Sequence, residues 1–531
     1  MGRKWGMTRR RIAAAVAFGV LLSAPVTADA VPVKPLVPVP LPDLPVQPAG
    51  IEIPPESVPQ EGCQPDPLET GIQKLRCRYG PIVVTPGSNL ILIGPVTIEQ
   101  PRAEGFMLKM TPNMIDAVTG EVPHIHEVHL HHGVWLDAGT NGLDVDTPFM
   151  AAGEEKSVSS PPPGYGYRVH ATDEWLLNYM IHNQTAGTYT TFITYDLDWI
   201  NASSPAAANV VPVKPIWWDT VGGAYPVYNP TTAAGAPDHV RRVSRDLDDP
   251  SMEVVWMVGH VHPGGKRIDL TVNTCGATAR NTPIFSSEAL PNVRPGTVDP
   301  DFYGDTYGSW DYLMTATKPE FRFTMGPGDA VFMDTVYDST HPWYEAMGIV
   351  FGWGVPLDEA PPGYVAAPRC QPPAPELTTG IRTNVLPRDP IFGGTSPQFP
   401  DPATTSVQGQ PPVNTIDIRA FDFAPGGTAK PPAPVAAGSN VVVRNIDAAA
   451  SVFHTVTECA DACNKDTGQS YPLPDWGFDS AQLGYGIPGL TAAKNAYQWT
   501  WPIPAGTPLG TTLPFFCRVH PFMRGSVQVV G

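Results

Sequence analysis

The sequence predicts an all-β protein built from β-sandwiches. Through residue 356 the apolar residues come in short runs between turn residues, for example at 81–84, 89–93 and 105–110, and no helical period is sustained. Proline is very frequent, with 64 residues among 531, while charged residues make up only 16%. Proline suits turns and extended segments. The length allows about three domains, which we expect to be joined by proline-rich segments.

Residues 1–30 are typical of a secretory signal peptide. Arginines at 9–11 precede an apolar run from Ile12 to Leu22, and Ala28-Asp29-Ala30 suits a cleavage site. The alternative is a membrane anchor, but the run is too short to span a bilayer, and we expect no membrane span later in the chain. Residues 31–62 form a Pro-rich leader that we expect to be extended. The prediction is a secreted, extracellular protein of bacterial type.

The charge balance excludes some partners. The formal net charge is −18, and residues 1–30 carry five basic residues and one acidic residue, so the remainder is near −22 (−18 − 4). Such an acidic chain is a poor partner for nucleic acid or for anionic membranes.

The chain holds seven cysteines, a number that allows three disulfides in an oxidising compartment if Cys517 is set aside. Proximity in the sequence favours particular pairs, although the connectivity stays open: Cys459–Cys463, Cys63–Cys77 and Cys275–Cys370.

A compact loop near the C-terminus carries soft metal ligands. Cys517, His520 and Met523 follow one another at intervals of three residues, before an apolar strand-like run. Thiolate, imidazole and a weak axial thioether suit copper that cycles between Cu(I) and Cu(II), and His454 supplies the second imidazole. The plain alternative is a disulfide cysteine beside a surface histidine and a core methionine.

The middle of the chain is rich in histidine, with five in the segment 124–132 at positions His124, His126, His129, His131 and His132. Side chains alternate along a strand, so His124 and His126 would share one face, and His129 and His131 the other. The apolar flank at 133–136 argues against the alternative of a solvated His-rich strand.

Four further residues extend this pattern. His182 ends the apolar run 175–182, and His260-Val261-His262 would direct two rings to one face of a strand. Met347 opens another apolar run. Taken singly, a histidine or methionine at such a position is ordinarily a core residue. The order of these motifs along the chain is more informative than any one of them.

Residues 413–531 resemble a cupredoxin, and Cys517-Arg518-Val519-His520-Pro521-Phe522-Met523-Arg524-Gly525 is similar to the copper loop of amicyanin. This resemblance implies a Greek-key β-sandwich with one type 1 copper held by His454, Cys517, His520 and Met523. It also implies an electron-transfer role.

Residues 75–356 resemble the ascorbate-dependent copper monooxygenases, the family of peptidylglycine α-hydroxylating and dopamine β-monooxygenases. The resemblance rests on the order His-His, histidine-ended strand, His-x-His, methionine, and it implies two jelly-roll-like β-sandwich halves at 63–210 and 211–356. It implies up to two further coppers: an electron-transfer copper on His131, His132 and His182, and a catalytic, O2-binding copper on His260, His262 and Met347.

The sequence departs from the peptide-amidating members of that family. Val258 and Ile349 stand where an arginine and an asparagine hold the substrate carboxylate, and Phe351 replaces a tyrosine. We therefore expect another, unknown small-molecule or peptide substrate.

The sequence supports three functional hypotheses. The leading hypothesis is a copper monooxygenase whose cupredoxin, tethered by the Pro-rich linker at 357–412, delivers electrons. A non-enzymatic copper-binding and electron-transfer protein with a soluble redox partner is the alternative. A structural β-protein with a vestigial middle site is the third.

Overall fold

The structure is a computed structural model, and all described residues belong to the part of the chain from Pro45 to Gly531. The described residues are 62–91, 95–125, 127–139, 147–221, 228, 230, 237–247, 251–262, 264–273, 282–291, 312–339, 343, 346–369, 371–378, 380–382, 399–450, 452, 454–459, 477–481, 483–484 and 497–531. The expected signal peptide and nearly all of the leader lie outside this range.

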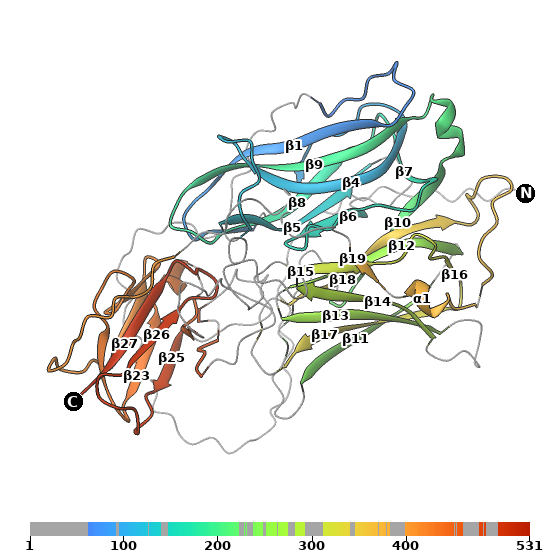
Figure 1. Ribbon diagram of the computed structural model, residues 1–531. Helices are drawn as coiled ribbons and strands as arrows, with labels where there is room; N and C mark the ends of the chain where they lie inside the picture. The colour runs from blue at the N-terminus through green and yellow to red at the C-terminus, as the bar shows by residue number, and fades with distance from the viewer. Residues whose placement is uncertain are drawn as a thin grey trace, which may run out of the picture. The chain divides into compact units, whose positions relative to one another are not determined.

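Two sheets form the first half of the chain (Figure 1). One contains β1 (Gln73–Val84), β9 (Tyr189–Asn201), β4 (Gly105–Asp116) and β7 (Tyr165–Val169), in that order. The other contains β2 (Asn89–Ile91), β8 (Trp175–Asn183), β5 (Val128–Asp137) and β6 (Thr147–Gly153), and β3 (Val96–Thr97) also pairs with β8. A short 3-10 helix, η1 (Pro205–Asn209), follows β9.

The first of these sheets continues into the second half of the chain. β7 pairs in parallel with β10 (Val211–Asp219), and the sheet then runs to its far edge. The order is β18 (Gly348–Pro356), β12 (Met252–Val261), β15 (Tyr312–Ala316), β14 (Thr282–Pro291), β13 (Gly265–Asn273), β17 (Ala330–Asp338) and β11 (Asp238–Asp246). β16 (Phe323–Met325) pairs with β12, and β19 (Ile381–Arg382) with β15.

Residue type matches position in this sheet. β18 is buried along its whole length and β12 along all but its first residue, and both are nearly continuous apolar runs, as strands covered on both faces require. The edge strand β11 alternates between half-buried and exposed and carries three arginines, which discourages pairing with another chain. The prediction of an all-β sandwich protein is confirmed.

One hydrophobic core serves both halves. A single cluster of buried residues extends from Cys63 to Val355, and Trp353 of the second half donates its Nε1–H to Ser159 Oγ of the first half at 2.7 Å. The two halves are therefore joined by backbone pairing, by packing and by a buried hydrogen bond.

The C-terminal region is a smaller sandwich with its own core. One sheet contains β21 (Asp422–Ala424), β20 (Thr415–Arg419), β23 (Asn440–Asn445) and β25 (Gln498–Pro502), and the other contains β22 (Ala433–Ala436), β27 (Arg524–Val530), β26 (Thr512–Phe516) and β24 (Thr457–Glu458). The 3-10 helix η3 (Asp447–Ala450) follows β23.

Parts of the expected linker at 357–412 are attached to the folded regions. Ala367 N donates to Glu253 Oε1 at 2.8 Å, and Val407 N donates to Gln528 Oε1 at 2.8 Å. A one-turn helix, α1 (Pro375–Thr378), lies between these contacts. The described linker residues thus follow the surface of the β-domains, the arrangement that many prolines and few apolar runs permit.

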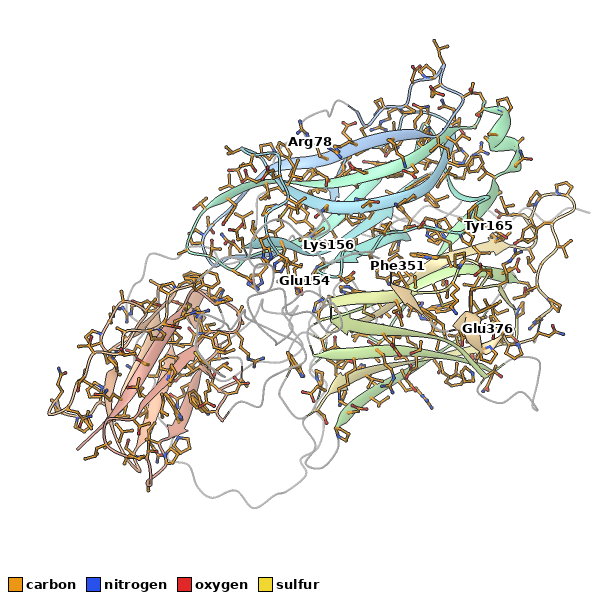
Figure 2. The ribbon with its side chains drawn as sticks, viewed as in Figure 1. Arg78, Glu154, Lys156, Tyr165, Phe351 and Glu376 are labelled. Carbon is orange, nitrogen blue, oxygen red and sulfur yellow. A yellow bond between two sulfur atoms is a disulfide. The ribbon has the colours of Figure 1, made fainter. Side chains whose placement is uncertain are left out.

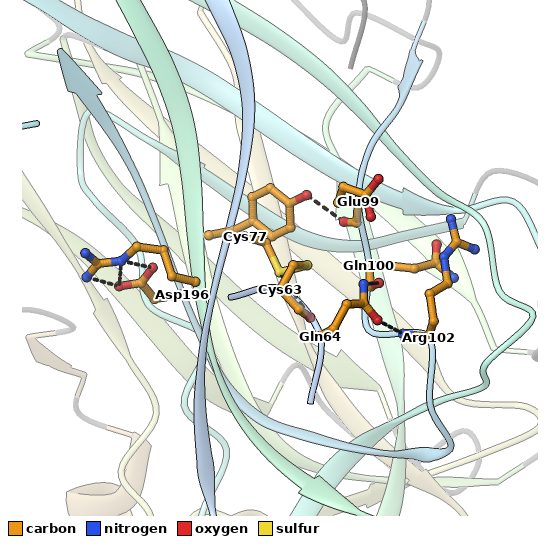
Figure 3. Close-up of a disulfide and its surroundings, with 9 residues drawn as sticks. Cys63, Gln64, Cys77, Glu99, Gln100, Arg102 and Asp196 are labelled. Atoms are coloured by element: carbon orange, nitrogen blue, oxygen red, sulfur yellow. Dashed lines mark hydrogen bonds and ion pairs between the residues drawn. A yellow bond between two sulfur atoms is a disulfide. The ribbon is translucent and has the colours of Figure 1, made fainter. Parts of the chain in front are cut away.

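The Cys63–Cys77 disulfide predicted by proximity is confirmed (Figure 3). It ties the segment before β1 to that strand, and Gln64 beside it donates to Gln100 O and accepts from Arg102 N, each at 2.8 Å. Cys459 is disulfide-bonded, while Cys463 and the pair Cys275–Cys370 lie outside the described residues. None of the helices in the described part of the chain has the length and apolarity needed to span a bilayer.

Candidate metal centres

The loop between β26 and β27 folds tightly on itself. Cys517 N donates to Met523 O at 3.0 Å, Met523 N to His520 O at 2.8 Å, and His520 N to Cys517 O at 3.2 Å. These bonds follow from a short connection between two antiparallel neighbours in one sheet. These hydrogen bonds hold the three predicted ligands of the loop, Cys517, His520 and Met523, close together in space, and all three side chains are buried.

Three ligand atoms converge at this loop. Cys517 Sγ lies 3.8 Å from His454 Nδ1 and 3.7 Å from His520 Nδ1, and the two nitrogens are 3.0 Å apart. Cys517 and both histidines have no exposed surface. A buried thiol facing two imidazole nitrogens is the donor set of a soft cation, so the residues present fit a metal ion. Met523 is buried on the same loop.

Asp447 orients the histidine that comes from outside the loop. Its Oδ2 lies 3.1 Å from His454 Nε2, which leaves Nδ1 to face Cys517. The same carboxylate accepts from Ala420 N at 2.8 Å and from Phe421 N at 3.0 Å, two residues with φ values of 51° and 58°. The Phe421 ring thereby lies 5.5 Å from His454 and 5.0 Å from His520 between centroids, and covers the site.

The electrostatics of this site favour a protonated His454 beside a Cys517 thiolate. Burial opposes protonation of His454, but the hydrogen bond to Asp447 and the contact with Cys517 raise its pKa to about 9. Burial also opposes ionisation of Cys517, yet His454 lowers the pKa of the thiol overall. Thr455 N donates to Cys517 Sγ at 3.3 Å. The thiolate, the form that binds metal, is thus stabilised.

A second group of histidines forms where β5 meets the end of β12. The register of β5 with β8 shifts between Leu130 and His132, a bulge that lets the adjacent residues His131 and His132 approach the same place. The ring centroids of these two histidines are 5.6 Å apart, and those of His131 and His262 are 4.6 Å apart. Ligand atoms of His131, His132 and His262 all lie within 4.8 Å of one another.

The histidines of 124–132 do not all follow the expected alternation. β5 begins only at Val128, after a turn in which Glu127 N donates to His124 O at 2.8 Å. His124 therefore precedes the strand, and His126 lies outside the described residues. Pro123, which cannot donate to a ladder, precedes this turn.

His260 and His262 come from the end of β12, where their ring centroids are 5.2 Å apart. His260 Nδ1 lies 3.1 Å from Glu155 Oε2, and Gly153 N fixes the other oxygen of that carboxylate at 3.0 Å. A Cβ on Gly153 would lie 2.5 Å from His131 O and 2.9 Å from Glu155 Oε2. Glycine is thus required for β6 to end this close to the histidines.

Burial keeps His131 and His132 neutral. It lowers the pKa of His132 to about 3, with a further contribution from His260, and it lowers the pKa of His131 well below the ordinary value, with a further contribution from His262. Neutral imidazole is the form that ligates metal. These two rings can therefore bind a cation at neutral pH without first being deprotonated from the imidazolium form.

His182 contacts the C-terminal loop. The sequence predicts that it shares a metal with His131 and His132, and in the structure its Nε2 lies 2.8 Å from Val519 O. Its ring centroid is 6.5 Å from that of His131 and 6.1 Å from that of His520. It stands next to both ligand groups.

Met347 immediately precedes β18, next to the end of β12. Val261 pairs with Gly348, so His262 and Met347 follow at the next position of the ladder. The Tyr337 hydroxyl joins them: it accepts from His262 N at 2.8 Å and from Met347 N at 3.1 Å, and donates to Met347 O at 2.7 Å. The structure thus brings the backbones of His262 and Met347 together.

Glu154 and Glu155 are the residues that the sequence analysis missed. Both are almost completely buried, and each faces histidines of one half of the region. Two adjacent acids, separated from the apolar run 149–152 only by Gly153, were the signal that could have revealed them, because acids at the end of an apolar strand are rarely buried unless they have a partner.

Comparisons with known proteins do not assign this chain to a family. No protein-family model and no curated protein matches the sequence. Among solved structures, the chain is weakly similar to the infectious bursal disease virus VP2 subviral particle, at 10% identity and a TM-score of 0.15, over 56% of this chain and 76% of that one. The structure of the Gt strain of the same virus gives 10% identity and a TM-score of 0.14, over 56% and 73%.

Proposed function

We propose that this chain is a secreted multi-copper redox protein. A type 1 copper in the C-terminal sandwich would be held by His454, Cys517, His520 and Met523. The observation that carries the proposal is the convergence of Cys517 Sγ with two imidazole Nδ1 atoms in a site without solvent exposure. When bound, copper would supply one-electron redox chemistry there.

The residues around the C-terminal site have distinct roles. Asp447 fixes the tautomer of His454, and the backbone N–H of Thr455 stabilises the thiolate of Cys517. The Phe421 ring excludes water from the side of the two histidines. Together they keep the ligands in place in both oxidation states, which keeps reorganisation small during electron transfer.

The middle region is proposed to hold up to two further copper ions on His131, His132, His182, His260, His262 and Met347. Within this set the group His131, His132 and His262 is the best supported, since its ligand atoms lie within 4.8 Å of one another and burial keeps His131 and His132 neutral. His260 and Met347 flank that group through Glu155 and Tyr337.

The reaction we propose is hydroxylation of an unknown small-molecule or peptide substrate by O2. One oxygen atom enters a C–H bond and the other leaves as water, so each turnover consumes two electrons and two protons from an external reductant. The C-terminal site would receive those electrons one at a time. In support, His182 contacts Val519 of the C-terminal loop and lies beside His131 of the middle group.

The alternative is a non-enzymatic extracellular protein that binds copper and transfers electrons to a soluble partner. O2 consumption separates the two functions. Copper-loaded protein is supplied with ascorbate and a panel of candidate substrates, and uptake of O2 is compared with formation of hydroxylated product. Product formation that is lost in His262→Ala supports the monooxygenase. O2 uptake that no substrate stimulates, with electron transfer intact, supports the alternative.

A further inference from the structure

A second set of metal-binding side chains lies directly beside the His131, His132 and His262 group. Glu154 follows β6 (Figure 2) and faces two histidines of β5, His129 and His131. Glu154 and His129 are each 1% exposed, and His131 is 7% exposed. A buried carboxylate and two buried imidazoles together are a donor set that divalent transition-metal ions prefer.

The hydrogen bonds of His129 determine which of its nitrogens faces Glu154. Nδ1 lies 2.5 Å from the carbonyl of Ile125 and donates to it, so Nε2 carries the lone pair. Nε2 lies 3.5 Å from Glu154 Oε1. The Nε2 lone pair and the carboxylate oxygen therefore lie close enough to bind one cation together.

His131 completes the set. Its Nδ1 contacts the same oxygen, Glu154 Oε1, and the three ligand atoms of His129, His131 and Glu154 lie within 4.8 Å of one another. We propose that these three side chains bind a divalent transition-metal ion next to the ion of the His131, His132 and His262 group, with His131 shared by the two. Two imidazoles and one carboxylate suit Cu²⁺, Zn²⁺ or Fe²⁺.

The shared histidine makes the two ions neighbours. An imidazole has two nitrogens, so His131 can offer Nδ1 to the Glu154 set and Nε2 to the group with His132 and His262. The ring that binds both ions is an imidazolate, and its N–H proton passes to solvent when the second ion binds. The bulge in β5 supports this arrangement, because it places His131 between His129 on one side and His132 on the other. The middle region thereby becomes a coupled two-metal centre instead of two separate sites. This inference rests on the proposed metal binding of the middle region.

The test is copper loading of the intact chain. Metal-free protein is saturated with Cu²⁺, loosely bound ions are removed, and bound copper is counted by elemental analysis. Electron paramagnetic resonance then reports whether two Cu²⁺ ions are spin-coupled. Glu154→Gln removes one ligand with little change of shape, His129→Gln removes another, and Glu127→Gln is the control, a half-buried acid just before β5 that belongs to neither set. The visible absorption of the C-terminal site confirms that each variant is folded.

Wild type and Glu127→Gln are expected to bind one equivalent at the C-terminal site and two coupled equivalents in the middle region. Glu154→Gln and His129→Gln should each lose one equivalent and the spin coupling. The inference is overturned if both variants keep the full count, since Glu154 then only orients His131. Wild type with copper at the C-terminal site alone would instead refute the proposed metal binding of the middle region.

Discussion

The ring centroids of His131 and His262 lie 4.6 Å apart, although the two residues come from different halves of the chain. His131 comes from the bulge of β5, and His262 directly follows β12. The two halves are held together by the parallel pairing of β7 with β10 and by a common core, so this approach is built into the fold. Residues from both predicted ligand sets, one set from each half, thus lie side by side.

We expect Cys517 to give the copper-loaded protein its visible absorption. Copper-loaded wild type should show the intense visible absorption of a copper–thiolate bond, and Cys517→Ser should abolish it because the alcohol cannot replace the thiolate. Met523→Leu should keep the absorption with a changed reduction potential, since the axial bond is weak. A Cys517→Ser variant that stays blue would contradict the assignment.

Asp447→Asn should raise the reduction potential of the C-terminal site while the absorption persists. The carboxylate lies 3.1 Å from His454 Nε2, and loss of its negative charge disfavours the more positive Cu²⁺ state. Asp417→Asn is the control, because Asp417 pairs with Arg444 on the surface of the same domain. Redox titration of both variants should show a shift for Asp447→Asn alone; equal potentials would disprove the role of Asp447.

Tyr337→Phe should weaken metal binding in the middle region and cost about 1–3 kcal/mol of unfolding free energy, because the backbones of His262 and Met347 lose their shared partner. Tyr228→Phe is a matched control: this buried ring packs 5.9 Å from Tyr337, and its hydroxyl makes no hydrogen bond within the described residues. Denaturation and copper titration of the two variants check the prediction. Equal losses would show that ring packing, not the hydroxyl, matters.

The metal-free protein should lose stability as the pH falls from 6.5 toward 4. Burial lowers the pKa of His182 from 6.5 to about 4, so in this window the unfolded chain binds a proton that the folded protein does not. The contribution is fully present above pH 6.5 and amounts to about 2 kcal/mol lost by pH 5. Denaturant midpoints at several pH values measure it. His182→Gln should reduce the slope by this contribution, and an unchanged slope would show that His182 makes no such contribution.

The sequence predicted local groupings better than distant ones. Cys517, His520 and Met523 are three residues apart, so a tight loop between two strands necessarily brings them together, and the fold class followed from short apolar runs. The approach of His131 to His262 depends on the pairing of β7 with β10 and on the bulge in β5, neither of which has a sequence signal of its own.

Glu154 and Glu155 were missed for a related reason. Whether an acid at the end of a strand is exposed or buried depends on the partner strand, and here Gly153 allows β6 to end against the backbone of His131. Likewise His182, at the end of an apolar strand, could be assigned to β8 but not to the contact with Val519, because that contact requires the C-terminal loop to be placed first.

We propose that electrons pass within the chain from the C-terminal site to the middle region. The most direct test is a fast photochemical reduction of the proposed type 1 centre in the copper-loaded, intact chain, followed by its visible absorption at several protein concentrations. If transfer is intramolecular, the absorption returns in a phase whose rate is independent of protein concentration, and His262→Ala removes this phase. A return whose rate rises in proportion to protein concentration, or a phase that persists unchanged in His262→Ala, would contradict the claim.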